Sequence, residues 1–506
     1  MTAVVSQHVA RNARKFAGRI AIRDSHGEMS YRALDEAMNR LGNYLIAQGV
    51  GPGDKVAILA KSSMRWVVAM LAISLARATC VPINYRLTKP EILANLEDAE
   101  CRLVFATSDL AEQNLKGAID CPVVLLDDAG GTTLAAVSER ASGAAPAIAH
   151  SDDDLQLIMF TGGTTGRSKG VMLRNRQCFW NTVHEIVDTG MSEFGNTVLG
   201  TPLHHAAALN CWLLPHLYLG AQSTILEDYS AERMIDAIHR HRSTNGFAPP
   251  SVARELCLAA RSDPKRMRTF TSWYVGGGIL SARDREDMHA LVPGMKIYYQ
   301  YGLTEAGPIV TVLKEEDYGL APDSIGRPFV NFEVKIARPD LADADLGEEG
   351  EILVRGPSVM EGYYKRPDAT RDAFHEGWLR TGDAGCMDGN GFVYFRDRIK
   401  DMVKTGGLNV YSQEVERVLQ KHPSIREVGI IGLPSERWGE EVTAVVVLRD
   451  GRTLSEAELI AFAKENLASY KAPKRAVFVD YADMPINYSG KIMKRELRTS
   501  IAAKPT

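Results

Sequence analysis

The apolar and polar positions of the first 310 residues alternate between short apolar runs and longer amphipathic stretches. Residues 21–23 and 29–31 predict a hairpin, because the turn Asp24-Ser25-His26-Gly27 separates them. The stretch 34–47 has helical periodicity and ends near Gly49. A strand, a buried helix and a strand are predicted next, over 56–59, 66–76 and 79–83. This alternation indicates layers of sheet built from strand–helix units.

The pattern changes between residues 325 and 394. Short β-rich runs at 332–336, 351–355 and 392–394 alternate with Gly, Pro and Asp turns, which predicts a small β subdomain. After Asp397-Arg398-Ile399-Lys400-Asp401 a further unit begins. Its predicted elements are helices over 412–420 and 456–466 and strands over 428–431 and 442–448. Residues 128–153 are rich in Gly, Ala, Ser and Asp and predict a surface connection.

Composition describes an ordinary globular chain of more than one domain. Its 506 residues exceed what one hydrophobic core organises, and 45% are hydrophobic and 24% charged. A net charge of −4 gives no indication of nucleic-acid or membrane-surface binding. Seven cysteines without a Cys-x-x-Cys pattern favour a reducing compartment. Without a signal core, and with its longest apolar stretch (66–76) too short for a bilayer, we expect a cytoplasmic protein with no integral membrane segment.

The first candidate for chemistry is Thr161-Gly162-Gly163-Thr164-Thr165-Gly166-Arg167-Ser168-Lys169-Gly170. Glycines let backbone N–H groups approach anionic oxygens, while hydroxyls and a lysine add donors and charge, so this run predicts a phosphate-binding loop. It follows a predicted strand over 155–160. It is not a Walker A loop, because two residues separate Gly166 from Lys169. The alternative is a flexible surface loop.

Seven further motifs follow this loop in order. They are Pro202-Leu203-His204-His205, Gly276-Gly277-Gly278, Tyr299-Gln300-Tyr301-Gly302-Leu303-Thr304-Glu305, Trp378-Leu379-Arg380-Thr381-Gly382-Asp383, Arg398-Ile399-Lys400-Asp401, Lys404-Thr405-Gly406-Gly407-Leu408-Asn409 and Gly490-Lys491-Ile492. With this set the chain resembles, throughout its length, the adenylate-forming superfamily of acyl-CoA synthetases, adenylation domains and luciferases. The resemblance implies an α/β fold with a large N-terminal domain, 1–399, of two βα sheet layers and a small β-barrel subdomain. It also implies a small mobile α+β C-terminal domain, 400–506.

The reaction that the resemblance implies has two steps. ATP activates a carboxylate to an acyl-adenylate with release of pyrophosphate, and the thiolate of coenzyme A then displaces AMP. Two anions must meet in the first step, so the site needs cations and donors around the α-phosphate and a metal across the phosphates. The implied cofactors are ATP, Mg²⁺ and coenzyme A as co-substrate.

The resemblance assigns the first-step roles to single residues. Glu305 is the implied Mg²⁺ ligand, with a solvated loop acid as the alternative, and Thr304 would donate its hydroxyl to the α-phosphate. Tyr301 would stack on adenine and Gln300 would bond its edge. The remaining positions assigned to the nucleotide are Thr161, Gly162, Gly163, Thr164, Thr165, Gly166, Lys169, Gly277, Gly278 and Gly302.

Three further residues complete the implied adenylation site. Asp383 would accept the ribose hydroxyls, although a turn residue after Gly382 would look the same, and Arg398 would touch the nucleotide. Lys491 is the implied catalytic lysine, bridging the carboxylate and the α-phosphate. The alternative for Lys491 is one more surface cation in a basic region.

For the second step the resemblance implies a rotation of the C-terminal domain about Lys400. The Gly406-Gly407 loop would then line a tunnel for pantetheine, with Trp438 nearby. Glycine at these positions leaves room for a slim thiol arm.

The identity of the acid is read from the predicted pocket residues. Trp180 and His184 lie four residues apart on one helix face, which lines the acyl pocket in related aryl-CoA ligases. His184 would bond a ring hydroxyl, and a satisfied core or surface histidine is the alternative. His205 is assigned near the substrate carboxylate as a catalytic residue, and Ala206 and Gly276 are assigned to the pocket. We expect an aromatic or a medium- or long-chain acid.

Other functions stay open from the sequence. The protein could load a carrier protein in trans instead of coenzyme A, or be a non-catalytic nucleotide-binding member. Amino-acid activation is disfavoured, because no acidic residue lies between Thr201 and Leu226 to pair with an ammonium group. The oligomeric state is also open, with a homodimer as one option.

Overall fold

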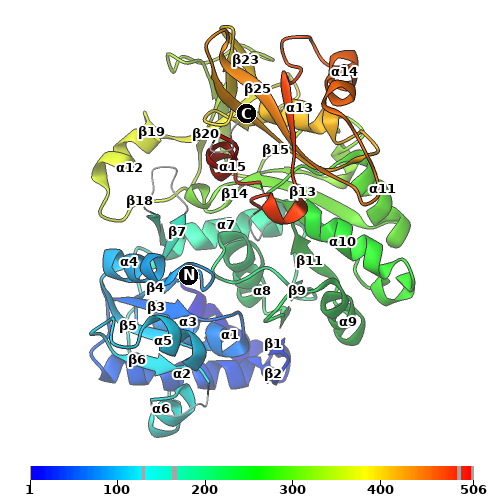
Figure 1. Ribbon diagram of the computed structural model, residues 1–506. Helices are drawn as coiled ribbons and strands as arrows, with labels where there is room; N and C mark the ends of the chain where they lie inside the picture. Colours follow the sequence, from blue (N-terminus) through cyan, green and yellow to red (C-terminus); the bar gives the residue numbers. More distant parts are fainter. Residues whose placement is uncertain (1, 128–131, 162–167, 487–491, 503–506) are drawn as a thin grey trace. The chain divides into compact units, whose positions relative to one another are not determined.

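The computed structural model describes residues 2–127, 132–161, 168–486 and 492–502. The chain forms two compact units (Figure 1). Unit 1 consists of Met1–Pro322, Gly326–Glu333 and Val354–Leu379, and unit 2 of Asp323–Ile325, Val334–Leu353 and Arg380–Thr506. The predicted domain boundary at 399/400 marks where the C-terminal domain is expected to rotate. The division into two compact units follows packing and does not test that rotation, so the boundary stays a prediction.

The first sheet of unit 1 has seven strands in the order β18-β8-β7-β4-β3-β5-β6. Their bounds are β3 Lys55–Leu59, β4 Thr79–Pro82, β5 Cys101–Ala106, β6 Val123–Leu125, β7 Leu155–Thr161, β8 Lys169–Arg174 and β18 Gly362–Tyr363. The strands β4, β3, β5 and β6 pair in parallel. Most residues of β3 and all residues of β4 are buried, as is usual for strands covered on both faces. The strands β7 and β8 form an antiparallel hairpin, and β18 adds to the edge of β8.

The second sheet of unit 1 has nine strands in the order β15-β14-β13-β12-β11-β9-β10-β1-β2. Their bounds are β1 Ile20–Asp24, β2 Gly27–Ser30, β9 Asn196–Leu199, β10 Gln222–Ile225, β11 Asn245–Ala248, β12 Ser272–Gly276, β13 Lys296–Gly302, β14 Ile309–Leu313 and β15 Arg327–Pro328. The strands β11, β12 and β13 are parallel. The motif that begins at Tyr299 therefore lies at the carboxyl end of β13, the usual place for a ligand site in such sheets.

Twelve α-helices are described in unit 1. They are α1 Val5–Lys15, α2 Tyr31–Ala47, α3 Met64–Leu75, α4 Lys89–Ala99, α5 Ser108–Asn114, α6 Leu134–Arg140, α7 Asn175–Thr189, α8 Leu214–Leu219, α9 Ala231–His241, α10 Pro250–Ala260, α11 Ala282–Leu291 and α12 Pro367–Ala373. A π-helical segment, η1, covers Ala207–Leu213 and leads into α8. Figure 1 shows α7 beside β7 and α8, and α7 also packs against η1 and β8.

Unit 2 contains most of one five-stranded sheet and all of another. The first has the order β16-β17-β20-β19 with β21 on β20, and the second β23-β22-β25-β24 with β26 on β25. The strand bounds are β16 Glu333–Ala337, β17 Gly350–Arg355, β19 Phe374–His375, β20 Trp378–Met387, β21 Val393–Arg398, β22 Val403–Thr405, β23 Leu408–Val410, β24 Ile425–Ser435, β25 Gly439–Leu448 and β26 Arg475–Phe478. Its helices are α13 Ser412–Leu419, α14 Glu456–Asn466 and α15 Lys494–Ala502.

Most predicted elements are confirmed, and one was missed. The helix predicted over 456–466 is α14, and the helix predicted from 34 begins at Tyr31, because the Ser30 side chain accepts a hydrogen bond from the Ala33 N–H and caps it. The segment 128–153, predicted as a connection, contains α6. The Thr133 side chain caps this helix, and Val137 is buried. An Ala- and Gly-rich composition does not predict these two features.

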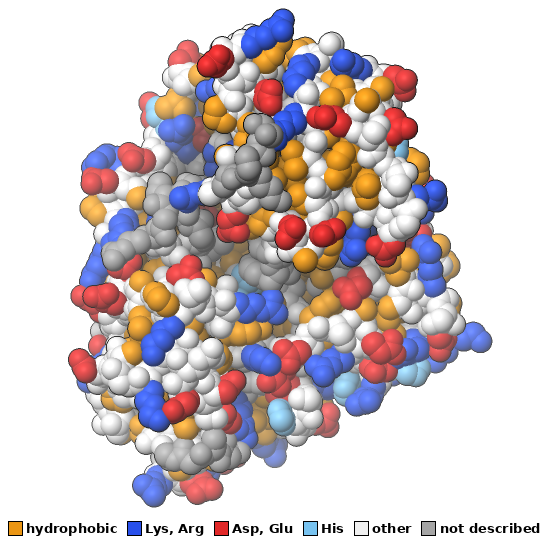
Figure 2. Space-filling view, viewed as in Figure 1, with side chains coloured by type: hydrophobic (Ala, Val, Ile, Leu, Met, Phe, Trp, Pro, Cys, Tyr) orange, Lys and Arg blue, Asp and Glu red, His pale blue; other side chains and the backbone are white. Residues whose placement is uncertain are grey.

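The surface and the cysteines agree with the bulk composition. Figure 2 shows basic and acidic side chains interspersed over the face in view. All seven cysteines are free thiols. In the parts of the chain that the structure describes, no helix has both the length and the apolar character needed to cross a membrane.

Candidate active site

The β7–β8 hairpin fixes both ends of the predicted phosphate loop. Thr161 pairs with Lys169 across the hairpin, and the Thr161 hydroxyl lies 3.4 Å from the Lys169 carbonyl oxygen, to which it donates. The strand predicted over 155–160 is therefore confirmed as β7. The loop residues Gly162, Gly163, Thr164, Thr165 and Gly166 lie outside the described residues.

Tyr363 joins this hairpin to Glu305. The Lys169 ammonium nitrogen lies 4.9 Å from the centroid of the Tyr363 ring, and the Tyr363 hydroxyl donates to Glu305 Oε1 at 2.9 Å. Burial, with the Glu305 carboxylate beside it, raises the pKa of Tyr363, so the phenol keeps its proton and remains a donor. Pairing of β18 with β8 positions Tyr363, and the Met360 N–H donates to the Glu305 carbonyl oxygen at 2.8 Å. Sequence reasoning missed Tyr363, which stands in no motif of its own.

Thr304 and Glu305 form the short 3-10 helix η3 (Thr304–Ala306), which directly follows β13. No group of three or more His, Cys, Asp or Glu side chains among the described residues could hold a metal ion. A single carboxylate fits Mg²⁺ rather than a metal held by protein alone, because Mg²⁺ takes one or two carboxylates together with substrate phosphates and waters. The residues present therefore fit a magnesium ion that binds with the nucleotide.

The glycine segment 276–278 lies beside the motif on β13. Gly276 pairs with Gln300, and a Cβ at Gly276 would come within 2.7 Å of the Gln300 carbonyl oxygen. The Tyr299 hydroxyl donates to the Gly278 carbonyl oxygen at 3.0 Å. A Cβ at Gly302 would lie 1.9 Å from the Pro308 carbonyl oxygen, so only glycine fits there. The two motifs thus meet at the carboxyl ends of the neighbouring strands β12 and β13.

The Gln300 side chain points toward α7. Its side chain is buried and its amide nitrogen donates to Glu185 Oε2 on α7 at 2.9 Å. A contact of this side chain with an adenine edge would require that bond to break. Side-chain alternation along a strand could have predicted this orientation from the sequence. Tyr299 and Tyr301 share one face of β13, and Gln300 lies on the other.

His204 and His205 pack together at the end of β9. Their ring centroids are 4.3 Å apart, and the His204 ring meets Tyr85 edge to face at 5.4 Å. Burial, with a smaller contribution from Arg86, lowers the pKa of His205 to about 3. His205 is therefore neutral at physiological pH and can act through its shape and hydrogen bonds, not as a cation.

Trp180 and His184 do share one face of α7, with ring centroids 6.3 Å apart. His184 is fully buried, its ring lies 5.2 Å from Phe332 and 6.3 Å from Phe329, and neither ring nitrogen has a hydrogen-bond partner among the described residues. Burial lowers the pKa of His184 to about 4. The alternative of a satisfied core histidine is disfavoured by the unpaired nitrogens. Ala206, also predicted for the pocket, is buried just before η1.

In unit 2, Asp383 and Arg398 come together across β20 and β21. The two residues pair in register, and Arg398 Nε lies 3.3 Å from Asp383 Oδ1. Gly382 has a φ of +70° and its N–H donates to Glu351 Oε1 at 3.0 Å. A left-handed glycine and the buried Glu351 carboxylate therefore hold the backbone of β20 next to Asp383.

The predicted coenzyme A residues of unit 2 are also neighbours. Gly406 and Gly407 form the two-residue turn between β22 and β23, with φ of +57° and +79°. The Gly406 N–H donates to the Trp438 carbonyl oxygen at 2.8 Å, and a Cβ at Gly406 would lie 3.2 Å from the Trp438 ring. Lys400 precedes this turn, and burial lowers its pKa. Lys491 lies outside the described residues.

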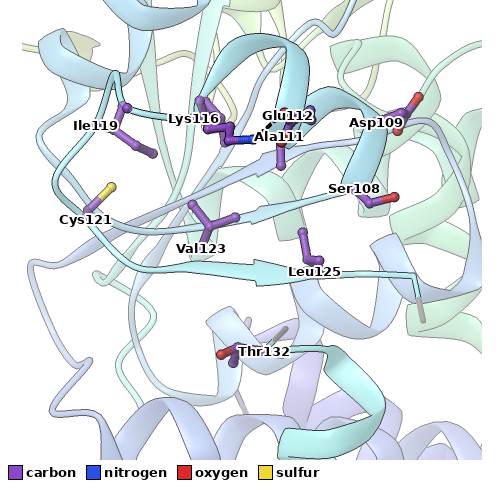
Figure 3. Close-up of a pocket in the computed structure, with 12 residues that line it drawn as sticks. Ser108, Asp109, Ala111, Glu112, Lys116, Ile119, Cys121, Val123, Leu125 and Thr132 are labelled. Carbon is purple, nitrogen blue, oxygen red and sulfur yellow. Dashed lines mark hydrogen bonds and ion pairs between the residues drawn. The ribbon is translucent and has the colours of Figure 1, made fainter. Parts of the chain in front are cut away.

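A separate pocket of about 710 Å³ lies elsewhere in unit 1, between α5 and β6 (Figure 3). Ser108 and Lys116 come from α5 and its end, and Cys121, Val123 and Leu125 from the chain through β6. None of the predicted site residues that the structure describes lines this pocket.

Parallel strands with the predicted site residues at the carboxyl end of β13 are typical of α/β nucleotide-binding enzymes. The chain belongs to the AMP-binding enzyme family: residues 9–364 match the family's main domain and residues 414–491 its C-terminal domain. This membership confirms the family and the fold class expected from the motifs.

Named relatives are similar over nearly their whole length. The chain is 34% identical over 488 residues to a feruloyl-CoA synthase of an Amycolatopsis species, covering 96% of this chain and 97% of that protein. It is 32% identical over 489 residues to the long-chain-fatty-acid–CoA ligase FadD13 of Mycobacterium tuberculosis, covering 94% and 93%. The structure of o-succinylbenzoate-CoA synthetase (MenE) from Bacillus subtilis, in complex with the acyl-adenylate intermediate OSB-AMP, matches with a TM-score of 0.87 at 28% identity over 97% of each chain.

Proposed function

We propose that the protein is an ATP-dependent carboxylate–CoA ligase, which forms an acyl-adenylate and pyrophosphate and then an acyl-CoA thioester and AMP. The observation that carries this proposal is the contact of Glu305, through Tyr363, with the β7–β8 hairpin of the phosphate loop. Family membership and relatives named as CoA ligases or synthases support the same reaction. The cofactors are ATP, Mg²⁺ and coenzyme A.

Adenylation brings a carboxylate to the α-phosphate against charge repulsion. Lys169 and the loop donors hold the phosphates, and Thr304 donates its hydroxyl to the α-phosphate. Glu305 would hold Mg²⁺, which would neutralise phosphate charge when bound, and the Tyr363 hydroxyl orients that carboxylate. Lys491 bridges the acid's carboxylate and the α-phosphate as charge builds in the transition state.

The rest of the nucleotide is held by two groups of residues. Tyr301 stacks on adenine, and the glycine segment 276–278 leaves room beside it. Asp383 accepts hydrogen bonds from the ribose hydroxyls, with the Arg398 guanidinium holding its carboxylate in place. These roles are supported by the motifs and by the contacts within each unit.

Thioester formation uses the predicted coenzyme A residues of unit 2. The Gly406-Gly407 turn and Trp438, which lie against each other, line the pantetheine path after rotation about Lys400. The domain boundary for this rotation is 399/400.

The acid is aromatic in this proposal. Trp180, Phe329 and Phe332 surround His184, and this cluster favours a planar ring with a hydroxyl that His184 can bond. The feruloyl-CoA synthase supports an aromatic acid, whereas the long-chain ligase keeps an alkyl acid as the competing outcome. A neutral His205 near the carboxylate fits a hydrogen-bonding role.

A pyrophosphate-release assay over benzoic, hydroxycinnamic and medium- and long-chain acids tests this function. With Mg²⁺, ATP and coenzyme A we expect AMP, pyrophosphate and the aryl-CoA thioester, identified by mass. ADP and phosphate as products would contradict the adenylate mechanism. Pyrophosphate release without any thioester would favour an acceptor carrier protein. Fractionation of the cells that make the protein tests the proposed cytoplasmic location. Sedimentation of the purified protein tests the homodimer.

A further inference from the structure

A buried acid on α7 takes no part in the proposed reaction. Glu185 is fully buried, and its Oε2 accepts the hydrogen bond from the Gln300 amide nitrogen at 2.9 Å. Gln300 is almost as deeply buried, at 2% exposure. Neither Glu185 Oε1 nor Gln300 Oε1 has a hydrogen-bond partner among the described residues. The Gln300 bond is therefore the polar interaction that links Glu185 to β13, and the Cys211 thiol of η1 is a second polar partner of the same carboxyl group.

This bond joins two elements that carry different parts of the nucleotide motifs. The helix α7 follows directly on β8, the strand that begins at Lys169. Gln300 directly precedes the run from Tyr301 to Glu305 on β13 and η3. Backbone pairing with Gly276 of β12 and Val312 of β14 fixes β13 inside its own sheet. The Glu185–Gln300 bond adds a link from β13 to the helix behind the phosphate hairpin.

The surroundings of Glu185 favour the uncharged carboxyl. Asp188 on α7 is the nearby charge, and the Lys314 ammonium group bonds Asp188 at 3.1 Å. Cys211 of η1 and Tyr274 of β12 complete the titratable neighbours, and burial raises the pKa of both. The Tyr274 hydroxyl is bonded to Thr189 at 3.3 Å. Burial raises the pKa of Glu185 to about 8, and it outweighs the hydrogen bonds with Gln300 and Cys211, which act in the opposite direction.

We propose that Glu185 is a positioning residue of the nucleotide site: it accepts the Gln300 hydrogen bond and so holds the end of β13, which leads into Tyr301, Thr304 and Glu305. Ionisation would make Glu185 a stronger acceptor for the Gln300 amide, but it would also leave a buried charge with no cation beside it among the described residues, and water would have to enter the contact. Nucleotide binding should then weaken as Glu185 loses its proton. The proposal rests on the proposed function in taking this motif as the nucleotide site.

Binding of MgATP, measured by calorimetry without acid or coenzyme A between about pH 6.5 and 9.5, tests the proposal. Glu185→Leu removes the acceptor, and we expect the Kd for ATP to rise roughly three- to tenfold at pH 7, as for one lost hydrogen bond. Glu185→Gln keeps an oxygen that accepts from Gln300, so it should bind ATP like the wild type at pH 7. It should also lack the weakening that the wild type shows near pH 8.

A double-mutant cycle separates the bond from packing. Gln300→Leu should weaken ATP binding as much as Glu185→Leu, and the doubly substituted protein should be no worse than either single variant. Asp284→Asn is the matched control, because Asp284 is a buried carboxylate of the same unit that caps α11 and pairs with Arg254 at 3.1 Å. It should lower the melting temperature without changing the pH dependence of ATP binding.

Two results would overturn the proposal. One is the same pH dependence of ATP binding in the wild type and in Glu185→Gln. The other is a Glu185→Leu protein that melts lower yet binds ATP with an unchanged Kd. If Glu185→Leu fails to fold, the comparison of wild type with Glu185→Gln decides alone. A wild type that does not bind MgATP at any pH would instead refute the proposed function itself, and this inference with it.

Discussion

At the scale of single residues, the site depends on how neighbours set charge and orientation. The Tyr363 hydroxyl orients Glu305 through a hydrogen bond, and burial raises the pKa of Tyr363 so that it keeps its proton. Burial also lowers the pKa of His205 and so keeps it neutral. Neither effect is a property of the isolated side chain, because both arise from desolvation and from the groups in contact.

Glu305→Gln tests the metal ligand at this scale. The change keeps the shape of the side chain and the Tyr363 contact but removes the charge that attracts Mg²⁺. We expect kcat to fall roughly 10²-fold or more, with a higher requirement for Mg²⁺. Turnover measured against Mg²⁺ concentration checks this, with Tyr363→Phe as a milder companion. An unchanged rate and Mg²⁺ dependence would place the metal elsewhere.

His184→Ala tests the acid pocket. The histidine lies among aromatic rings, and its ring nitrogens have no hydrogen-bond partner in the described part of the chain, so its loss should cost about 1 kcal/mol for acids that bear a ring hydroxyl. Specificity constants should fall more for hydroxycinnamic acids than for alkyl acids, while the KM for ATP stays close to that of the wild type. An equal change across the acid panel would place His184 outside the pocket.

Glu185 gives stability a defined pH dependence. Its pKa is raised to about 8 in the folded protein from 4.5, so between these values the folded state holds a proton that the unfolded state lacks. Stability therefore falls as pH rises through that window, by about 1.4 kcal/mol per pH unit from this group. Glu185→Gln should unfold at nearly the wild-type denaturant concentration at pH 5 and at a clearly higher one at pH 8. Parallel curves at both pH values would contradict the raised pKa.

At the scale of elements, the β22–β23 turn shows a local structure set by glycine. Gly406 and Gly407 both have positive φ, the geometry that two-residue hairpin turns require. The sequence marks these glycines, while the position of Trp438 against Gly406 depends on β25, which begins at the residue after Trp438.

Gly407→Leu tests this turn as part of the pantetheine path. A Cβ at Gly407 meets no atom of the described residues within 4 Å, so the leucine would project into the space where the thiol arm is proposed to pass. We expect slower thioester formation with adenylate formation spared. Gly451→Leu is the matched control, since Gly451 has a φ of +69° and is equally open. Equal losses in both half-reactions, or in both variants, would point to backbone strain instead.

At the scale of the whole molecule, the proposed reaction divides between a large unit and a C-terminal one. Unit 1 holds the phosphate hairpin, Tyr363 and Glu305, and unit 2 holds Asp383, Arg398 and the Gly406-Gly407 turn. Since Lys491 is proposed to act in one arrangement only, each half-reaction should respond differently to its loss.

Lys491→Ala tests that division. Loss of a charge that bridges carboxylate and α-phosphate should cost on the order of 3–4 kcal/mol in the adenylation transition state. Chemically prepared acyl-adenylate should still be converted to the thioester at close to the wild-type rate. Normal adenylation, or an equal failure with preformed adenylate, would remove the support for both the lysine's role and the rotation.

The sequence by itself determined the order of motifs, the family, the expected reaction and most element positions. Helix α14, the β7–β8 hairpin and the Gly-Gly turn depend on neighbours close in the chain, so their signals are local. The alternation of side chains along β13 also predicts that Gln300 faces away from Tyr299 and Tyr301.

Only the tertiary structure decided which distant side chains meet. Tyr363 reaches Glu305 because β18 pairs with β8, and Glu185 reaches Gln300 because α7 packs across to β13. Such contacts join residues 58 and 115 positions apart, and no local pattern encodes them. The charge states of His184, Glu185 and His205 follow in turn from burial. Desolvation is a property of the packed interior, which exists only once the sheets and helices have come together.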